Sequence, residues 1–198
     1  ICSVPWDPKL EVYTAWDLGV ADSTTIWFFQ QYGYEIRVID YYENSGEGLG
    51  HYVKALRGQV PNGEHRGEYV YGGHYAPHDI EVREFTSGKS RIEAARELGV
   101  KFTTVKKHEV EDGIEMVRMT IPMCWFDMEK CARGIEGLRQ YRKEWDEKNM
   151  CFKNRPIHDW TSHPSDGFRI LVMGRKARPK NQSRPNRAKD ETNYLAIT

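Results

Sequence analysis

The sequence lacks several features that mark whole classes of protein. None of its four cysteines forms a Cys-x-x-Cys pair, and it shows no charged-then-apolar leader, so we expect reduced thiols and a protein that is not secreted. No apolar run is long enough to cross a bilayer, which argues against a membrane partner. No internal repeat is present. The whole sequence is 39% hydrophobic and 29% charged, unlike the composition of a disordered chain.

The sequence also has no net charge, because 29 basic residues balance 29 acidic ones. This balance argues against a protein that coats nucleic acid through bulk electrostatics. The charges are unevenly placed, since seven basic and only two acidic residues follow position 173. We therefore predict a mildly acidic body and a basic tail at 174–198, which the prolines Pro179 and Pro185 make disordered.

The length of 198 residues suits one well-buried domain and is short for two. The chain begins at Ile1 rather than methionine, so we expect a piece of a longer protein. On this interpretation residues 1–11 are a linker from an upstream domain, 12–173 are the folded domain and 174–198 are the tail.

The order of strand-like and helix-like segments predicts an α/β fold with a mixed central β-sheet. Strands are expected at 12–17, 24–31 and 35–42, antiparallel to one another, and later at 69–75 and 100–105. Helices are expected at 49–57, 90–98, 113–124, 128–148 and 165–173. Alternation of strands and helices after the first three strands indicates helices on both faces of the sheet.

Three aspartates stand where predicted elements begin or end: Asp17, Asp79 and Asp166. Carboxylates that converge from separate elements are typical ligands of hard divalent cations such as Mg²⁺ and Mn²⁺. Two such ions together can hold the attacking water and the leaving oxygen of a phosphodiester. A single aspartate at such a position is more often a cap or a turn residue, so only the set of three favours a metal site.

The residues around these aspartates resemble the C-terminal nuclease domain of bacteriophage large terminase subunits, which has a ribonuclease H-like fold. The resemblance covers about 12–173 and depends on Ala15-Trp16-Asp17-Leu18-Gly19, on Pro77-His78-Asp79, and on the segment 158–169. That segment, HDWTSHPSDGFR, is similar to the family pattern HDxxSHxxDAFR. Gly167 replaces the usual alanine, a change expected to cost a little helix stability and no chemistry.

The resemblance implies a metal-dependent endonuclease that cuts concatemeric double-stranded viral DNA during packaging, with low sequence specificity. By position, Asp17, Asp79 and Asp166 match the catalytic acidic triad, which would bind two Mg²⁺ or Mn²⁺ ions. Glu43 is a further candidate ligand, although it is equally suited to cap a helix. Three residues are candidates for orienting these ligands or touching DNA: His163, Asp159 and Lys89. For His163 we favour a structural role at the helix start.

The same resemblance implies partners and a location. The partners are double-stranded DNA, an upstream ATPase domain of the same polypeptide, the portal protein and the small terminase subunit. The location is the cytoplasm of the infected bacterial host, at the procapsid. The basic tail is expected to bind DNA or the portal.

Several alternatives stay open beside this interpretation. A junction resolvase or transposase-like nuclease would use a similar carboxylate cluster, and a non-catalytic DNA- or motor-docking module could keep the fold alone. The Gly-Lys-Ser at 88–90 is not a P-loop, because the first glycine of that motif is replaced by Arg83. The cysteine spacing fits no common zinc module. Base stacking is conceivable for four aromatic residues, but their helical spacing favours core packing: Trp125, Phe126, Tyr141 and Trp145.

Overall fold

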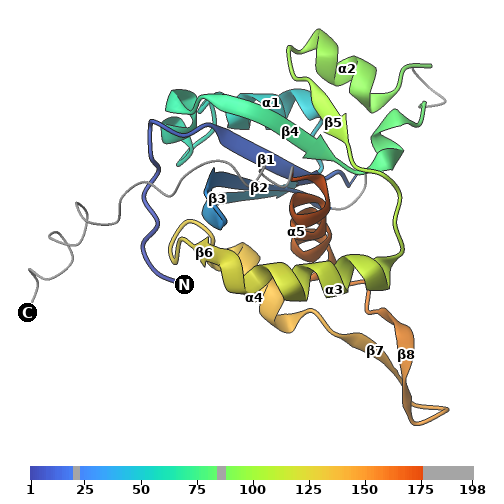
Figure 1. The fold of residues 1–198 in the computed structure, drawn as a ribbon. Helices are drawn as coiled ribbons and strands as arrows, with labels where there is room; N and C mark the ends of the chain where they lie inside the picture. Colours follow the sequence, from blue (N-terminus) through green and yellow to red (C-terminus); the bar gives the residue numbers. More distant parts are fainter. Residues whose placement is uncertain (20–22, 84–87, 176–198) are drawn as a thin grey trace, which may run out of the picture.

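A computed structural model describes residues 1–19, 23–83 and 88–175 of the chain. These residues form a six-stranded mixed sheet with helices on both faces and a separate two-stranded hairpin that projects from the body (Figure 1). The predicted α/β fold with a mixed central sheet is thereby confirmed. The predicted tail lies outside the described residues from position 176 onward. None of the described helices is both long and apolar enough to span a membrane.

The elements follow one another along the chain with short connections. The sheet consists of β1 (Val12–Asp17), β2 (Ser23–Tyr32), β3 (Glu35–Ser45), β4 (Tyr71–Ala76), β5 (Phe102–Thr104) and β6 (Cys124–Phe126). The α-helices are α1 (Leu49–Leu56), α2 (Arg91–Glu97), α3 (Val110–Thr120), α4 (Ala132–Gln140) and α5 (Ser162–Gly174). The short 3-10 turns are η1 (Glu64–Glu68), η2 (His78–Glu81) and η3 (Ile121–Met123), and the hairpin consists of β7 (Lys143–Asp146) and β8 (Cys151–Pro156).

The strand order in the sheet is β5-β4-β1-β2-β3-β6. The first three strands form the predicted antiparallel meander, and β4 then pairs parallel to β1, β5 parallel to β4, and β6 parallel to β3. Because β2 is antiparallel to both of its neighbours, β1 and β3 run in the same direction. The carboxyl ends of β1, β3 and β4 therefore lie at the same end of the sheet.

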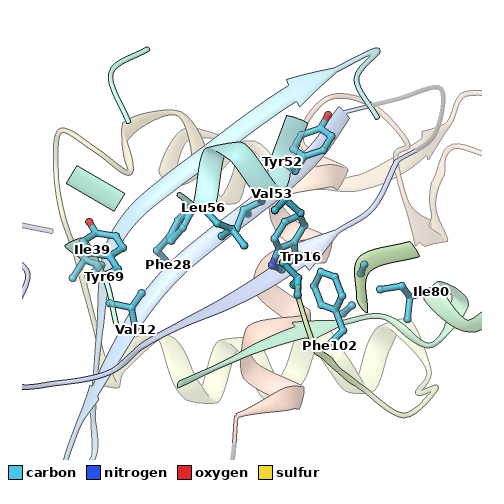
Figure 2. Packing of buried hydrophobic residues seen from close by; sticks show 14 of the residues in the cluster. Val12, Trp16, Phe28, Ile39, Tyr52, Val53, Leu56, Tyr69, Ile80 and Phe102 are labelled. Atoms are coloured by element: carbon cyan, nitrogen blue, oxygen red, sulfur yellow. The ribbon is translucent and has the colours of Figure 1, made fainter. Parts of the chain in front are cut away.

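The central strands are buried on both faces, which divides the core into two layers. Trp16 and Phe28 face α1 and pack with Tyr52, Val53 and Leu56 of that helix (Figure 2). A second layer lies on the opposite face, which α4 and α5 cover. In this layer side chains of β1 and β2 pack against side chains of the two helices: Ala15, Trp27 and Phe29 from the strands, and Ile135, Phe168 and Leu171 from the helices. The alternation of side chains along β1 and β2 thus supplies both layers at once.

The prediction of one long helix at 128–148 is wrong. Helix α4 ends at Gln140, and the chain then forms β7 and β8. The turn between them is held by Asp146, whose Oδ1 accepts hydrogen bonds from the backbone N–H groups of Lys148 and Asn149. Such local side-chain hydrogen bonds compete with a helix. The hairpin also explains why Trp145 is 44% exposed and packs against Phe152 rather than in the core.

The predicted helix at 113–124 is also only partly correct. Helix α3 begins earlier, at Val110, and ends at Thr120, because Pro122 lies in the 3-10 turn that starts at Ile121. Residues Cys124–Phe126 instead form an edge strand beside β3. Within that strand Phe126 is buried, as predicted, whereas Trp125 is 48% exposed.

The segment 1–11, predicted to be a linker, packs on the domain. Cys2 forms a parallel bridge with Asp127, so the segment continues the sheet beyond β6. The N–H of Val4 donates to Asp127 Oδ2 at 2.9 Å, and the Val4 side chain is buried in the first core layer. Trp6 then packs against Tyr69, with ring centroids 5.3 Å apart and the rings tilted by 51°.

We predict that Gly134→Ala destabilises the domain by about 1–3 kcal/mol, because a new Cβ would lie 2.4 Å from Trp27 Cη2 and 2.8 Å from the Tyr41 ring. The matched control is Gly50→Ala in α1, where a new Cβ meets nothing within 4 Å. This control should unfold at the same temperature as the wild type or a higher one, since alanine has the better helix propensity. Thermal denaturation of both variants checks the pair, and equal losses in the two would contradict the assigned packing of α4.

We also predict that His74 makes the domain less stable in mild acid. Its Nδ1 lies 2.7 Å from Thr14 Oγ1, and burial lowers its pKa from 6.5 to about 4. Between those values the unfolded chain binds a proton that the native chain does not, so stability falls as the pH drops. The variant His74→Asn has no imidazole to titrate. Its free energy of unfolding should therefore change less with pH than that of the wild type, by up to about 1.4 kcal/mol per pH unit. Urea denaturation between pH 4 and 6.5 measures it, and parallel slopes for both proteins would refute the prediction.

Candidate active site

A row of three side chains crosses the sheet where β1 ends. Asp17, the last residue of β1, pairs in register with Thr25 of β2, which in turn pairs with Glu43 of β3. Residues opposite one another in neighbouring strands point to the same face. The row therefore brings two carboxylates and a hydroxyl to the face that α4 and α5 cover. The side chains of Asp17 and Glu43 are 22% and 16% exposed, so water reaches both.

Helix α5 begins at Ser162, three residues earlier than predicted, because Asp159 organises its start. Asp159 Oδ1 accepts hydrogen bonds from both the N–H and the hydroxyl of Thr161. These hydrogen bonds, the one from the hydroxyl being the largest cause, lower the pKa of Asp159. Pro164 falls in the first turn, where proline is tolerated. Asp159 therefore has a structural role, and it also forms an ion pair with Arg142 at 3.4 Å.

The first turn of α5 is fixed directly to β2. Thr25 Oγ1 donates to the carbonyl of His163 at 3.0 Å, and Trp27 Nε1 donates to the carbonyl of Pro164 at 2.8 Å. Gly167 lies at this contact, since a Cβ there would be 2.8 Å from Thr25 Oγ1 and 3.5 Å from the backbone N of Asp17. The glycine thus allows a close approach of helix and sheet, a role beyond the small change in helix propensity that the sequence predicts.

This docking places Asp166 close to Asp17. Burial raises the pKa of Asp166, and the Asp17 charge raises it further against the opposing effect of Arg169. Arg169 Nη1 donates to Asp166 Oδ1 at 2.7 Å, and His163 Nδ1 lies 3.2 Å from Asp17 Oδ2. Each carboxylate of the pair therefore has a basic partner on α5. His163 thus contacts the Asp17 carboxylate from the first turn of α5, a contact that the favoured role at the helix start does not include.

Glu43 lies in the site and does not cap a helix. Strand β3 continues to Ser45, and the residue before α1 is Gly48. Glu43 Oε2 accepts a hydrogen bond from Tyr41 Oη at 2.8 Å. The sequence holds a signal for this, because Glu43 continues the alternation set by Tyr41 beyond the predicted end of the strand at position 42.

Asp79 comes from a third element, the 3-10 turn that follows β4. It is exposed in η2, just after β4. Strand β4 is parallel to β1, with Tyr75 opposite Ala15, so Asp79 follows the same end of the sheet as Asp17. The expected convergence of all three carboxylates is not found: residues 1–19, 23–83 and 88–175 contain no group of three or more His, Cys, Asp or Glu side chains that could hold a metal ion. Repulsion between like charges opposes convergence of the three carboxylates, and the basic partners of Asp17 and Asp166 are the His163 and Arg169 side chains.

Lys89 lies on the other side of the sheet end. Its Nζ is 2.6 Å from Glu97 Oε1, and it lines a pocket with Leu18 and Gly19, the residues that follow Asp17. Ser90 and Glu93 form a capping box at the start of α2, so this serine caps a helix. Residues 84–87, part of the rejected P-loop segment, lie outside the described residues.

Comparison with known proteins gives matches among solved structures only, since no protein-family model and no curated protein matches the chain. The large terminase of a thermophilic bacteriophage, in complex with ADP, has a TM-score of 0.64 at 20% identity over 86% of this chain. The nuclease domain of the P22 large terminase has a TM-score of 0.62 at 15% identity, covering 88% of this chain and 87% of that domain. The nuclease domain of the bacteriophage SPP1 large terminase, solved with bound Mn, has a TM-score of 0.57 at 15% identity, covering 81% of this chain and 84% of that domain.

These likenesses define the class of fold, which is the ribonuclease H-like fold. Within that class, the chain has the fold of the nuclease domain of bacteriophage large terminases, as the sequence motifs predict. The chain spans about 40% of the length of the ADP-bound large terminase from the thermophilic bacteriophage.

We predict that Asp166→Asn raises the stability of the chain in EDTA at pH 7. The folded state raises the pKa of this carboxyl, so its ionised form costs stability above that pKa and nothing at a pH low enough to protonate both states. The gain should be at most about 1 kcal/mol, because the side chain is 34% exposed and solvent screens it. Thermal denaturation at pH 7 and at pH 3 measures the effect. A variant less stable than the wild type at pH 7 would show that the Arg169 contact outweighs the repulsion.

Proposed function

We propose that this chain is a metal-dependent endonuclease that cleaves concatemeric double-stranded viral DNA during genome packaging. The observation that carries the proposal is the Asp17–Asp166 pair, held together at the end of β1 although burial and mutual repulsion raise the pKa of Asp166. Active sites are where such costly arrangements of like charges are found. The fold shared with terminase nuclease domains supports the same conclusion.

The donor atoms suit a hard divalent cation, because they are carboxylate oxygens. We propose that Asp17 and Asp166 hold Mg²⁺ or Mn²⁺, two ions in all, with Asp79 and Glu43 as the further ligands at the same end of the sheet. The Mn bound to the SPP1 nuclease domain supports this choice of metal. When bound, such ions activate a water for in-line attack and stabilise the departing oxygen.

The remaining groups of the site keep the carboxylates in place. His163 contacts Asp17 Oδ2, and Arg169 donates to Asp166 Oδ1, so neither carboxylate rotates freely. Thr25 holds the helix turn that carries His163. Because contacts to phosphate and metal carry no base information, we propose low sequence specificity.

The proposed partners follow from the same likeness. They are double-stranded DNA, an upstream ATPase domain of the same polypeptide, the portal protein and the small terminase subunit. The large terminase from the thermophilic bacteriophage was solved with ADP, which supports a nucleotide-binding domain in the longer protein. The proposed location is the host cytoplasm, at the procapsid.

The test is incubation of the 198-residue chain with supercoiled plasmid in Mn²⁺, Mg²⁺ or EDTA. We expect nicked and linear products with metal and none in EDTA. Asp17→Asn and Asp166→Asn should reduce the rate at least about 100-fold, since they remove charge from the reacting centre. Asp79→Asn and Glu43→Gln, which change the further proposed ligands, should also reduce the rate.

The matched control is Asp7→Asn, because Asp7 contacts Gln30, near the opposite end of β2 from Thr25. This variant should cut like the wild type. A wild-type chain that neither cuts plasmid nor binds Mn²⁺ by calorimetry would overturn the proposal in favour of a non-catalytic docking module. Cleavage of branched DNA alone would instead favour a junction resolvase or a transposase-like nuclease.

A further inference from the structure

Arg133 of α4 lies at the edge of the carboxylate row in an unusual setting. Its guanidinium carbon is 3.7 Å from the ring centroid of Trp160, and its Nε is 3.6 Å from Glu43 Oε2. The Arg133 side chain is 55% exposed, whereas Glu43 beneath it is 16% exposed. The arginine therefore covers the rim of the site and faces solvent.

The helix that carries Arg133 is fixed by two glycines. Gly134 lies against Trp27 and Tyr41, and Gly137 lies against Pro164, each at distances that leave no room for a Cβ without a shift. A Cβ at Gly137 would also come into ordinary van der Waals contact with Trp160. The start of α4 is thus pressed onto both the sheet and the first turn of α5. The position of Arg133 relative to the carboxylates is consequently set by the packed core and not by a mobile loop.

The chemistry of this setting favours binding of a phosphate. A guanidinium stacked on an indole loses side-chain freedom in advance, and it keeps its planar fork of N–H donors for an oxyanion. The ion pair with Glu43 is longer than a strong hydrogen bond, so it leaves donors for another acceptor. Other basic groups at the site have closer carboxylate partners, with Arg169 at 2.7 Å and His163 at 3.2 Å.

The distance along the row fits a DNA strand. Glu43 and Asp17 are separated by one intervening strand, which corresponds to roughly 10 Å across the sheet. A DNA strand that runs along this row, with its scissile phosphate at Asp17 and Asp166, would pass Arg133 within about one or two nucleotides. We propose that Arg133, positioned by Trp160, binds a backbone phosphate beside the scissile one and so sets the register of the DNA strand; this inference rests on the proposed nuclease function.

The test compares binding of a short DNA duplex by fluorescence anisotropy in Ca²⁺ over a series of salt concentrations. The logarithm of the affinity falls as the logarithm of the salt concentration rises, and loss of one phosphate contact makes this fall shallower by about 0.9. The change corresponds to roughly eightfold weaker binding at 0.1 M salt. We expect this for Arg133→Gln, a smaller loss of affinity with the slope retained for Arg133→Lys, and an intermediate loss for Trp160→Leu. The matched control is Arg139→Gln on the same helix, an exposed arginine 3.9 Å from Glu136, which should bind like the wild type.

Cleavage of the same duplex in Mn²⁺ separates this inference from the proposed function. Arg133→Gln should raise KM with kcat within about threefold of the wild type, because a neighbouring phosphate contributes binding and not bond breaking. If the wild type cuts and Arg133→Gln binds and cuts equally well, the inference fails and the function stands. If Arg133→Gln loses affinity as expected but no protein cuts, the phosphate contact stands and the nuclease function fails. Equal losses in Arg133→Gln and Arg139→Gln, or no binding by the wild type, would also overturn the inference.

Discussion

The docking of the first turn of α5 on β2 is the contact on which the whole site depends. Two side chains of β2, Thr25 and Trp27, donate to carbonyls of that turn, and Gly167 lets the backbones approach. The same Trp27 packs against Tyr41 and Phe168, so the polar contact lies within the second core layer. A residue on α5 is thereby brought beside the last residue of β1, although the two are far apart in the sequence. Without this contact Asp17 and Asp166 would be two unrelated carboxylates.

Their proximity costs stability, and the surrounding charges limit that cost. Each carboxylate of the site has a basic neighbour: His163 beside Asp17, Arg169 beside Asp166 and Arg133 beside Glu43. A divalent cation would have to compete with these groups for the carboxylates. Such a trade of stability for function is common at active sites.

Much of the fold follows from local sequence patterns. The apolar, β-branched and aromatic runs of β1, β2 and β3 predict the meander, and the Ser90 cap predicts α2, because these signals are local. The hairpin of β7 and β8 and the edge strand β6 are not predicted, because they depend on turn hydrogen bonds of Asp146 and on pairing with β3. For the site, the motifs single out Asp17 and Asp166, and the docking of α5 brings both to the end of β1. The motifs do not indicate the register that aligns Glu43 with Asp17, since that register depends on the pairing of three strands.

The most direct test of the central claim is calorimetric titration of Mn²⁺ into the wild-type chain, Asp17→Asn, Asp166→Asn and the control Asp7→Asn. The account predicts binding to the wild type and the control, and a loss of at least about tenfold in affinity for each site variant, because each loses a charged oxygen ligand. Wild-type affinity in both site variants, or no binding to the wild type, would contradict the claim that the turn of α5 and the end of β1 build a metal site together.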